Sequence, residues 1–192
     1  MNILDQKNNT GFTLIETLVA VSIFTVSVIA LITVLANSIS DTNYAKRKLA
    51  ATYLAQEGIE YARNMRDTYL LYPPAATVGW DDFKVKLSPC DTATSGSCYF
   101  DEQALNFTDQ SQPIIDVSVN ACPLSVCPNL LYNSVTGKYN YSTGVDSGFQ
   151  RKLYITNINN NEIQIVSTVS FLENNNTYEV KLSENLFNWI RP

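Results

Sequence analysis

The apolar residues concentrate in one stretch near the N-terminus. Residues 17–40 are 24 consecutive positions without a charged residue, a proline or a glycine, and 16 of them are apolar. As a helix with a rise of about 1.5 Å per residue, this stretch would span about 36 Å, enough to cross a hydrocarbon core of about 30 Å. Its hydroxyl side chains can hydrogen-bond to the helix backbone. The pattern therefore predicts a transmembrane helix.

Three other interpretations of this stretch are open. A buried core helix of a small domain is seldom this long and this apolar. In a cleaved secretory signal peptide, Ala36-Asn37-Ser38 could be the cleavage site, but the apolar region would normally span about 7–15 residues. An ordinary signal anchor is the third interpretation. None of the three explains Glu16, which stands at the head of the apolar run.

Beyond Ser40 the sequence stays compatible with a helix but becomes amphipathic. Its apolar residues recur at spacings of three and four, the period of one helix face: Ala51, Leu54, Ala55, Ile59, Ala62, Met65 and Tyr69. Pro73-Pro74 should end the helix. We predict one rod from Thr13 to about Leu71, some ~85–90 Å long, whose distal half packs on a domain. Gly58 costs up to ~1 kcal/mol inside a helix, which indicates close approach of a strand.

The C-terminal third alternates between apolar and polar residues, as strands do. Strands are expected at 152–158, 162–171 and 177–182, with the Asn-rich segments 159–161 and 174–176 as turns, because Asn tolerates left-handed backbone angles. We expect an antiparallel meander whose apolar face covers the distal helix. Residues 183–192 are expected to form a short helix or tail, with Leu186, Phe187 and Trp189 against the sheet. Residues 114–119 are a further candidate strand, and 73–150 otherwise look loop-rich. The fold class is α+β.

Composition excludes several classes of function. The 192 residues contain no histidine, which rules out Ser-His-Asp and Cys-His nucleophile systems and imidazole metal ligands. Thirteen basic against eighteen acidic residues give a net charge of −5, without the clustered positive charge of nucleic-acid binding. No phosphate loop, paired-carboxylate motif or activated nucleophile emerges. We expect no enzyme activity, no cofactor, no metal ion and no nucleic-acid partner.

Four cysteines lie in the loop-rich middle of the chain: Cys90, Cys98, Cys122 and Cys127. They allow three pairings, of which Cys90–Cys98 with Cys122–Cys127 is favoured because sequence-local pairs close without threading. Disulfides are the expected fate of cysteines in an exported domain. The alternative is a four-thiolate zinc site, but the first spacing does not fit the usual C-x₂₋₄-C pattern.

Glu16 stands in the string Gly11-Phe12-Thr13-Leu14-Ile15-Glu16-Thr17-Leu18-Val19. Thr13 and Glu16 alone would suit a helix start, with Thr13 as N-cap and Glu16 three residues later. The whole string resembles the cleavage and methylation signature of type IV prepilins and pseudopilins, and this resemblance covers about the first 40 residues. Residues 54–67 also look like the second segment of minor pseudopilins.

The resemblance implies a domain organisation and a processing route. Residues 1–11 would be a leader on the cytoplasmic side, 12–40 the transmembrane and assembly helix, 41–72 its amphipathic half, and 73–192 a pilin-like globular head. The head would comprise a cysteine-containing region, 73–150, and a β meander, 151–192. A prepilin peptidase would cut between Gly11 and Phe12 and methylate the new amino terminus of Phe12. The mature chain would begin as a single-pass protein of the cytoplasmic membrane with an extracytoplasmic head.

The resemblance also gives Glu16 a role in assembly. In a filament, Glu16 would pair with the Phe12 ammonium of a neighbouring subunit, which offsets the cost of a carboxylate out of water and fixes the stagger between helices. The partners would be other pilin or pseudopilin subunits of a type IV pilus, a type II secretion system or a competence machine. The distribution of charges does not agree with this scheme. Lys46-Arg47-Lys48 follow the apolar stretch, and positive charges there favour the orientation with the head on the cytoplasmic side. The alternative is a membrane-anchored extracytoplasmic binding or adhesion domain that does not polymerise.

Overall fold

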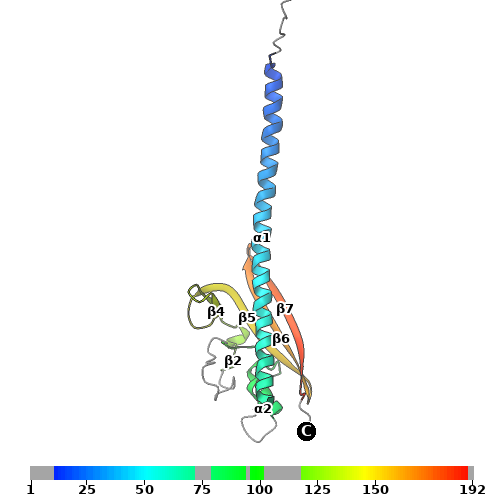
Figure 1. Cartoon of the computed structure of the whole chain (residues 1–192), viewed down its shortest axis with the longest axis vertical. Coiled ribbons are helices and arrows are strands. Elements are labelled where there is room, and N and C mark those ends of the chain that lie inside the picture. Colours follow the sequence, from blue (N-terminus) through cyan, green and yellow to red (C-terminus); the bar gives the residue numbers. More distant parts are fainter. Residues whose placement is uncertain (1–10, 72–78, 94–95, 102–117, 190–192) are drawn as a thin grey trace, which may run out of the picture. The chain divides into compact units, whose positions relative to one another are not determined.

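The computed structural model describes residues 11–71, 79–93, 96–101 and 118–189 (Figure 1). It has an α+β architecture, as predicted: a long helix, α1 (Leu14–Leu71), packs its C-terminal part on a small antiparallel sheet, beside a short helix, α2 (Gly79–Lys86). The chain divides into two compact units, Met1–Ala45 and Lys46–Pro192, which we describe separately. We call the second unit the head.

The sheet of the head is built around its longest strands. Among the described residues, β6 lies between β5 and β7, and the other edge of β5 pairs with β1 and β3, which in turn pair with β2 and β4. The strands are β1 (Cys98–Tyr99), β2 (Asn120–Ala121), β3 (Asn129–Asn133), β4 (Lys138–Asn140), β5 (Val145–Asn159), β6 (Glu162–Glu173) and β7 (Asn176–Phe187). Two 3-10 turns, Ser88–Cys90 and Pro123–Ser125, lie in the connections.

Helix α1 confirms the predicted period and end. It stops at Leu71, two residues before Pro73-Pro74, where the chain can no longer supply the backbone N–H groups that a helix needs. Every residue of the predicted apolar stripe from Ala51 to Tyr69 is buried. Gly58 lies against the sheet: a Cβ added there would be 2.8 Å from Ser167 Oγ and 3.2 Å from Leu153 Cδ2. The inference that a strand passes close to Gly58 is therefore confirmed.

The predicted strands are present but longer than expected. β5 begins at Val145 instead of residue 152, and β6 ends at Glu173. The expectation of a short helix or tail from residue 183 is wrong for 183–187, which continue β7 in register with β6. Glu184 interrupts the apolar alternation of β7, because it occupies an inward position of the strand. Its charge is matched by Arg63 of α1. Leu186 is buried as expected, whereas Phe187 and Trp189 are half exposed.

The middle of the chain contains more regular structure than the sequence suggested. Helix α2 and strands β1, β2, β3 and β4 all fall within 73–150, where only a loop-rich segment was expected. The candidate strand at 114–119 lies largely outside the described residues. The described strand nearest to it is the two-residue β2.

The two Asn-rich turns close in different ways. In the β6–β7 turn, Asn174 and Asn175 have φ angles of 49° and 62°, the left-handed conformation expected of Asn. In the β5–β6 turn no positive φ is found; instead Asn159 Oδ1 accepts a hydrogen bond from the Asn161 backbone N–H at 2.9 Å. The β5–β6 turn was thus predicted at the correct place, but an Asn side chain and not a left-handed backbone closes it.

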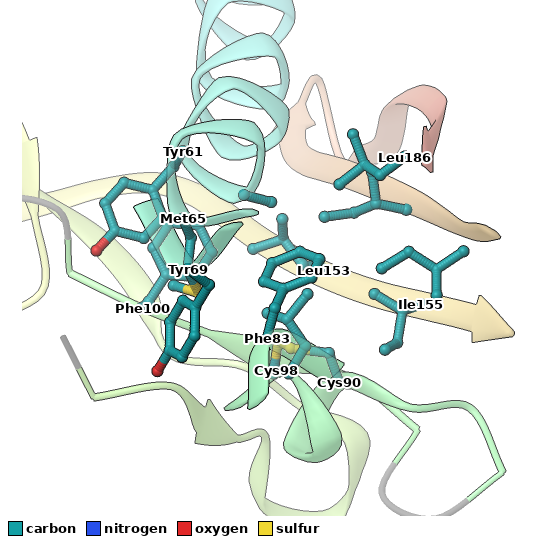
Figure 2. Close-up of a cluster of buried hydrophobic side chains, with 14 of the residues drawn as sticks. Tyr61, Met65, Tyr69, Phe83, Cys90, Cys98, Phe100, Leu153, Ile155 and Leu186 are labelled. Carbon is teal, nitrogen blue, oxygen red and sulfur yellow. A yellow bond between two sulfur atoms is a disulfide. The ribbon is translucent and has the colours of Figure 1, made fainter. Parts of the chain in front are cut away.

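The hydrophobic core lies between the head part of α1, helix α2 and the inner face of the sheet (Figure 2). Met65 and Tyr69 of α1 pack near Phe83 of α2, and the rings of Tyr61 and Phe100 stack at a centroid distance of 4.1 Å. The inward face predicted for β6 is confirmed, because its residues are all buried: Ile163, Ile165, Ser167, Val169 and Phe171. Val166 and Thr168 of the opposite face are buried as well, so burial does not alternate in the middle of the strand.

Candidate processing and assembly segment

The residues before α1 are open to solvent. Gly11, Phe12 and Thr13 precede the first helical residue, and Phe12 is 81% exposed. Among the described residues, no atom beyond the chain neighbours of Gly11 lies within 4 Å of the position that a Cβ on Gly11 would occupy. The Gly11–Phe12 peptide bond is therefore sterically accessible to an enzyme that approaches from outside.

Thr13 and Glu16 form the start of the helix. The backbone N–H of Glu16 donates to Thr13 Oγ1 at 3.3 Å and to the Thr13 carbonyl at 3.1 Å. These contacts satisfy one of the N–H groups that the first turn of a helix otherwise leaves free. Glu16 is the acidic residue of the first turn, where the helix dipole favours a carboxylate. Its side chain is exposed, so it is available to a group outside this chain.

The apolar segment of α1 is uncovered over its whole length. Its large apolar side chains are between 49% and 70% exposed from Leu18 to Ile39, apart from the half-buried Val28. Among the described residues, α1 is the one helix long and apolar enough to cross a membrane. An isolated protein in water rarely presents so much contiguous apolar surface, which indicates a lipid or protein environment.

The hydroxyl groups of this segment bond to their own helix. Ser22 Oγ donates to the Leu18 carbonyl at 2.8 Å, and Ser27 Oγ to the Ile23 carbonyl at 2.8 Å. Thr25, Thr33 and Ser38 donate in the same way to carbonyls three or four residues earlier. A hydroxyl satisfied in this manner loses little on entering an apolar medium, as predicted from the sequence.

A buried arginine joins the head part of α1 to the sheet. Arg151 of β5 is fully buried, and its Nη1 donates to Glu57 Oε2 at 3.3 Å and to the Leu54 carbonyl at 3.4 Å, both on α1. Its Nη2 donates to the Phe100 carbonyl at 3.4 Å, and its guanidinium lies 5.5 Å from the Phe100 ring centroid. Sequence reasoning missed this residue because its partner Glu57 lies 94 positions away.

A second ion pair ties the last strand to α1. Arg63 makes a two-pronged contact with Glu184 of β7, Nε at 3.2 Å and Nη2 at 2.6 Å, and its Nη1 contacts Glu60 at 2.7 Å. The hydrogen bonds to Glu184 raise the pKa of the Arg63 guanidinium above its ordinary value. Charged side chains of α1 are therefore in part structural links to the sheet.

Arg47 makes a third link, at the beginning of the head. Its guanidinium carbon lies 5.1 Å from the ring centroid of Phe149 and 5.7 Å from that of Phe171, and its Nε is 3.5 Å from Glu173. These contacts hold the first turns of the head part of α1 against β5 and the β6–β7 turn. One of the three adjacent basic residues is therefore matched by a carboxylate.

The four cysteines form the two disulfides that were favoured from the sequence, Cys90–Cys98 and Cys122–Cys127. The alternative of a four-thiolate zinc site is therefore wrong, because each sulfur is bonded to another sulfur. No group of three or more acidic or cysteine side chains within the described residues is placed to hold a metal ion.

The head also contains an open cleft of about 550 Å³ between α2, the adjacent 3-10 turn and the end of β5. Its lining is mixed, and includes the polar residues Asp81, Asp91 and Asn157 and the apolar Ile155. Asn157 Nδ2 donates to Asp91 Oδ2 at 2.9 Å, which fixes one wall. The cleft was not predicted from the sequence.

Comparison with known proteins adds one positive finding. Residues 6–32 match the family model described as the prokaryotic N-terminal methylation motif, which is the type IV prepilin signature. The comparisons with curated proteins and with solved structures gave no match. The N-terminal segment is thus prepilin-like, and the apolar helix with this motif fits a membrane-anchored protein. The motif implies processing by a prepilin peptidase and assembly with pilins.

Proposed function

We propose that this chain is a structural subunit, a minor pilin or pseudopilin, and not an enzyme. A prepilin peptidase would cut between Gly11 and Phe12, methylate Phe12, and leave the single-pass helix in the cytoplasmic membrane with an extracytoplasmic head. The mature subunit would then assemble through this helix into a type IV pilus, a type II secretion pseudopilus or a competence pseudopilus.

The observation that carries the proposal is the joint geometry of the N-terminal segment. An accessible Gly11–Phe12 bond leads directly into a capped helix whose apolar surface is uncovered and whose sole charged residue as far as Ser40 is Glu16. Neither a cleaved signal peptide nor a buried core helix requires all of these features together. The matched motif covers the same residues.

Glu16 supplies the specificity of assembly in this proposal. A carboxylate that leaves water among bundled apolar helices is costly, and pairing with a cation offsets that cost. Cleavage creates such a cation at Phe12, four residues before Glu16. The cap already holds the Glu16 backbone, so the side chain is free to reach the Phe12 ammonium of a neighbouring subunit. Apolar helices alone slide past one another, whereas this charge pair sets their stagger.

The decisive experiment is N-terminal mass spectrometry of the protein extracted from membranes of its host. The expected mature chain begins at N-methylated Phe12. A chain that retains its first eleven residues, or one that starts near Asp41, would contradict processing by a prepilin peptidase. Loss of the Phe12 terminus in a strain without the peptidase is the matched control.

The cleft favours a second candidate function, a membrane-anchored binding or adhesion head that does not polymerise. Its volume of about 550 Å³ lies in the range of small-ligand sites, and its lining offers carboxylates and carboxamides to a polar ligand. The two candidates separate on sheared filaments: a polymerising subunit is recovered in that fraction, and an anchored receptor stays with the membrane.

A further inference from the structure

The cleft of about 550 Å³ in the head has one wall fixed to strand β5. The backbone N–H of Thr92 donates to the Ile155 carbonyl at 3.2 Å, and Asn157 Nδ2 donates to Asp91 Oδ2 at 2.9 Å. The other oxygen of this carboxylate, Asp91 Oδ1, accepts a hydrogen bond from the backbone N–H of Ala93 at 2.9 Å. We call the cleft the α2 cleft; its lining includes Asp81, Lys84, Val85, Asp91, Asn157 and Ile158.

Helix α2 forms another wall and is fixed to the β5–β6 turn. Trp80 Nε1 donates to the Asn160 carbonyl at 2.6 Å, and Lys84 Nζ lies 3.5 Å from the same oxygen. Lys84 also pairs with Asp81 one helical turn earlier, with Nζ and Oδ1 2.9 Å apart. Because both walls are held by contacts within the head, a ligand would not have to order them, and binding avoids that entropic cost.

The charges of the α2 cleft disfavour both cationic and anionic ligands. A cation would have to compete with Lys84 for Asp81 and with two N–H donors for Asp91. In the described parts of the chain, no group of three or more acidic or cysteine side chains is placed to hold a metal ion. An anion would face two carboxylates and a single ammonium group. The ligand that fits best is therefore polar but uncharged.

The α2 cleft places polar groups beside exposed aliphatic side chains. Val85 is 71% exposed and Ile158 51%, while Asn157, Asp91 and Lys84 carry hydrogen-bonding groups. A sugar combines the same two kinds of surface, because its hydroxyl groups donate and accept hydrogen bonds and the C–H groups of its ring are apolar. We propose that the α2 cleft binds a neutral sugar. Asn157 and Asp91 bond to its hydroxyl groups, and Val85 and Ile158 pack on its ring.

This inference deepens the second candidate function, a binding head, and rests on the cleft that favours it. It applies to a subunit that polymerises as well as to one that stays in the membrane. Recovery in sheared filaments tests polymerisation, whereas sugar binding tests the α2 cleft, so either can fail without the other.

Saturation-transfer NMR on the full chain tests the proposal. The protein is held in micelles of a zwitterionic detergent whose headgroup contains no sugar. The probes are glucose, galactose, mannose and N-acetylglucosamine, and cationic glucosamine and anionic glucuronate are added to test the charge argument. The two cleft variants are Asn157→Ala and Val85→Ser.

Matched control variants lie outside the α2 cleft. Asn185→Ala removes an exposed strand residue whose Nδ2 donates to Glu162 Oε1 at 2.8 Å, much as Asn157 donates to Asp91. Val145→Ser removes a valine that is 75% exposed, close to the 71% of Val85. All four positions are exposed, so the substitutions leave the core intact.

We expect at least one of the four neutral sugars to bind with a dissociation constant in the millimolar range, more tightly than glucosamine or glucuronate. Asn157→Ala should weaken this binding about tenfold, which corresponds to about 1.4 kcal/mol, and Val85→Ser should weaken it severalfold. The two control variants should bind as the unaltered chain does.

Three results would overturn the sugar site. The first is the absence of saturation transfer to all four neutral sugars at millimolar concentrations. The second is tighter binding of glucosamine or glucuronate than of any neutral sugar. The third is sugar binding that the cleft variants leave unchanged or that the control variants weaken equally, because the sugar would then lie elsewhere on the chain.

Discussion

Replacing Gly58 by Ala tests how closely α1 packs on the sheet. The added Cβ would lie 2.8 Å from Ser167 Oγ, 3.2 Å from Leu153 Cδ2 and 3.4 Å from Arg151 Cδ. Ser167 lies on the central strand β6, so the sheet cannot yield there without moving both of its neighbours. The substitution therefore has two opposing effects on the free energy of unfolding: Ala stabilises the helix, and the added methyl group overpacks the contact with the sheet.

The two effects can be compared in magnitude. Ala is favoured over Gly in a helix interior by about 1 kcal/mol, while overpacking a core costs about 1–3 kcal/mol. Since the shortest contact is below any real Cβ distance, we expect Gly58→Ala to lower the free energy of unfolding by about 1–2 kcal/mol. Ser167→Ala removes the atom that the new Cβ meets. Because Ser167 Oγ is buried and has no hydrogen-bond partner among the residues that the structure describes, its removal should cost little.

The double variant Gly58→Ala/Ser167→Ala should therefore regain the stabilisation that Ala gives to a helix. Its free energy of unfolding should be about 2 kcal/mol higher than the sum of the two single effects predicts. The assay is urea denaturation of the full chain in detergent micelles, followed by tryptophan fluorescence, to which the buried Trp80 contributes. Asn64→Ala, at an exposed position of the same helix, is the control and should be neutral or slightly stabilising. Additive single effects, or a stabilising Gly58→Ala, would refute the close-packing argument.

Three further outcomes follow from the geometry. Glu16→Ala should leave the protein inserted and processed but poorly incorporated, so immunoblots should find the mature chain in membranes and little of it in sheared filaments; normal incorporation would contradict the charge-pair mechanism. Joint replacement of Cys90 and Cys98 by Ala should lower the free energy of unfolding by about 2–3 kcal/mol, the loop-closure contribution of a short crosslink, measured against wild type by urea denaturation. Burial raises the pKa of Tyr139 above its ordinary value of 10.0, so the folded state disfavours the phenolate. The contribution of Tyr139 to the free energy of unfolding is then fully present below pH 10.0 and is lost as the pH rises through the pKa of the folded state. Tyr139→Phe should therefore flatten the loss of stability at alkaline pH, and an unchanged slope would show that another group is responsible.

The elements with a local signal could be predicted from the sequence. The uncharged run, the three-and-four spacing and Pro73-Pro74 define α1, and alternation defines β6, because these patterns depend on neighbours along the chain. The prepilin-like string Gly11 to Val19 could be identified for the same reason, because its residues are adjacent in the sequence. The two disulfides followed because each joins cysteines separated by eight or five positions.

What the sequence did not reveal depends on distant partners. An arginine within a strand is expected to face solvent, yet Arg151 occupies an inward position because Glu57 and two backbone carbonyls receive its guanidinium. Glu184 interrupts the apolar alternation of β7 for the same reason, since Arg63 lies 121 positions earlier. Helix α2 escaped notice because eight residues give too short a periodic pattern.

The position of β7 in the chain has a consequence for the order of biogenesis. Glu184, which anchors Arg63, and Leu186, which fills the core, are synthesised more than a hundred residues after the end of α1. Docking of α1 on a finished sheet must therefore await translation of β7. The hydrophobic stretch leaves the ribosome some 140 residues before Glu184, when β7 has not yet been made. In the proposed function, membrane integration therefore precedes folding of the head, and truncations that remove β7 should still yield an integrated protein whose helix has no completed sheet to rest on.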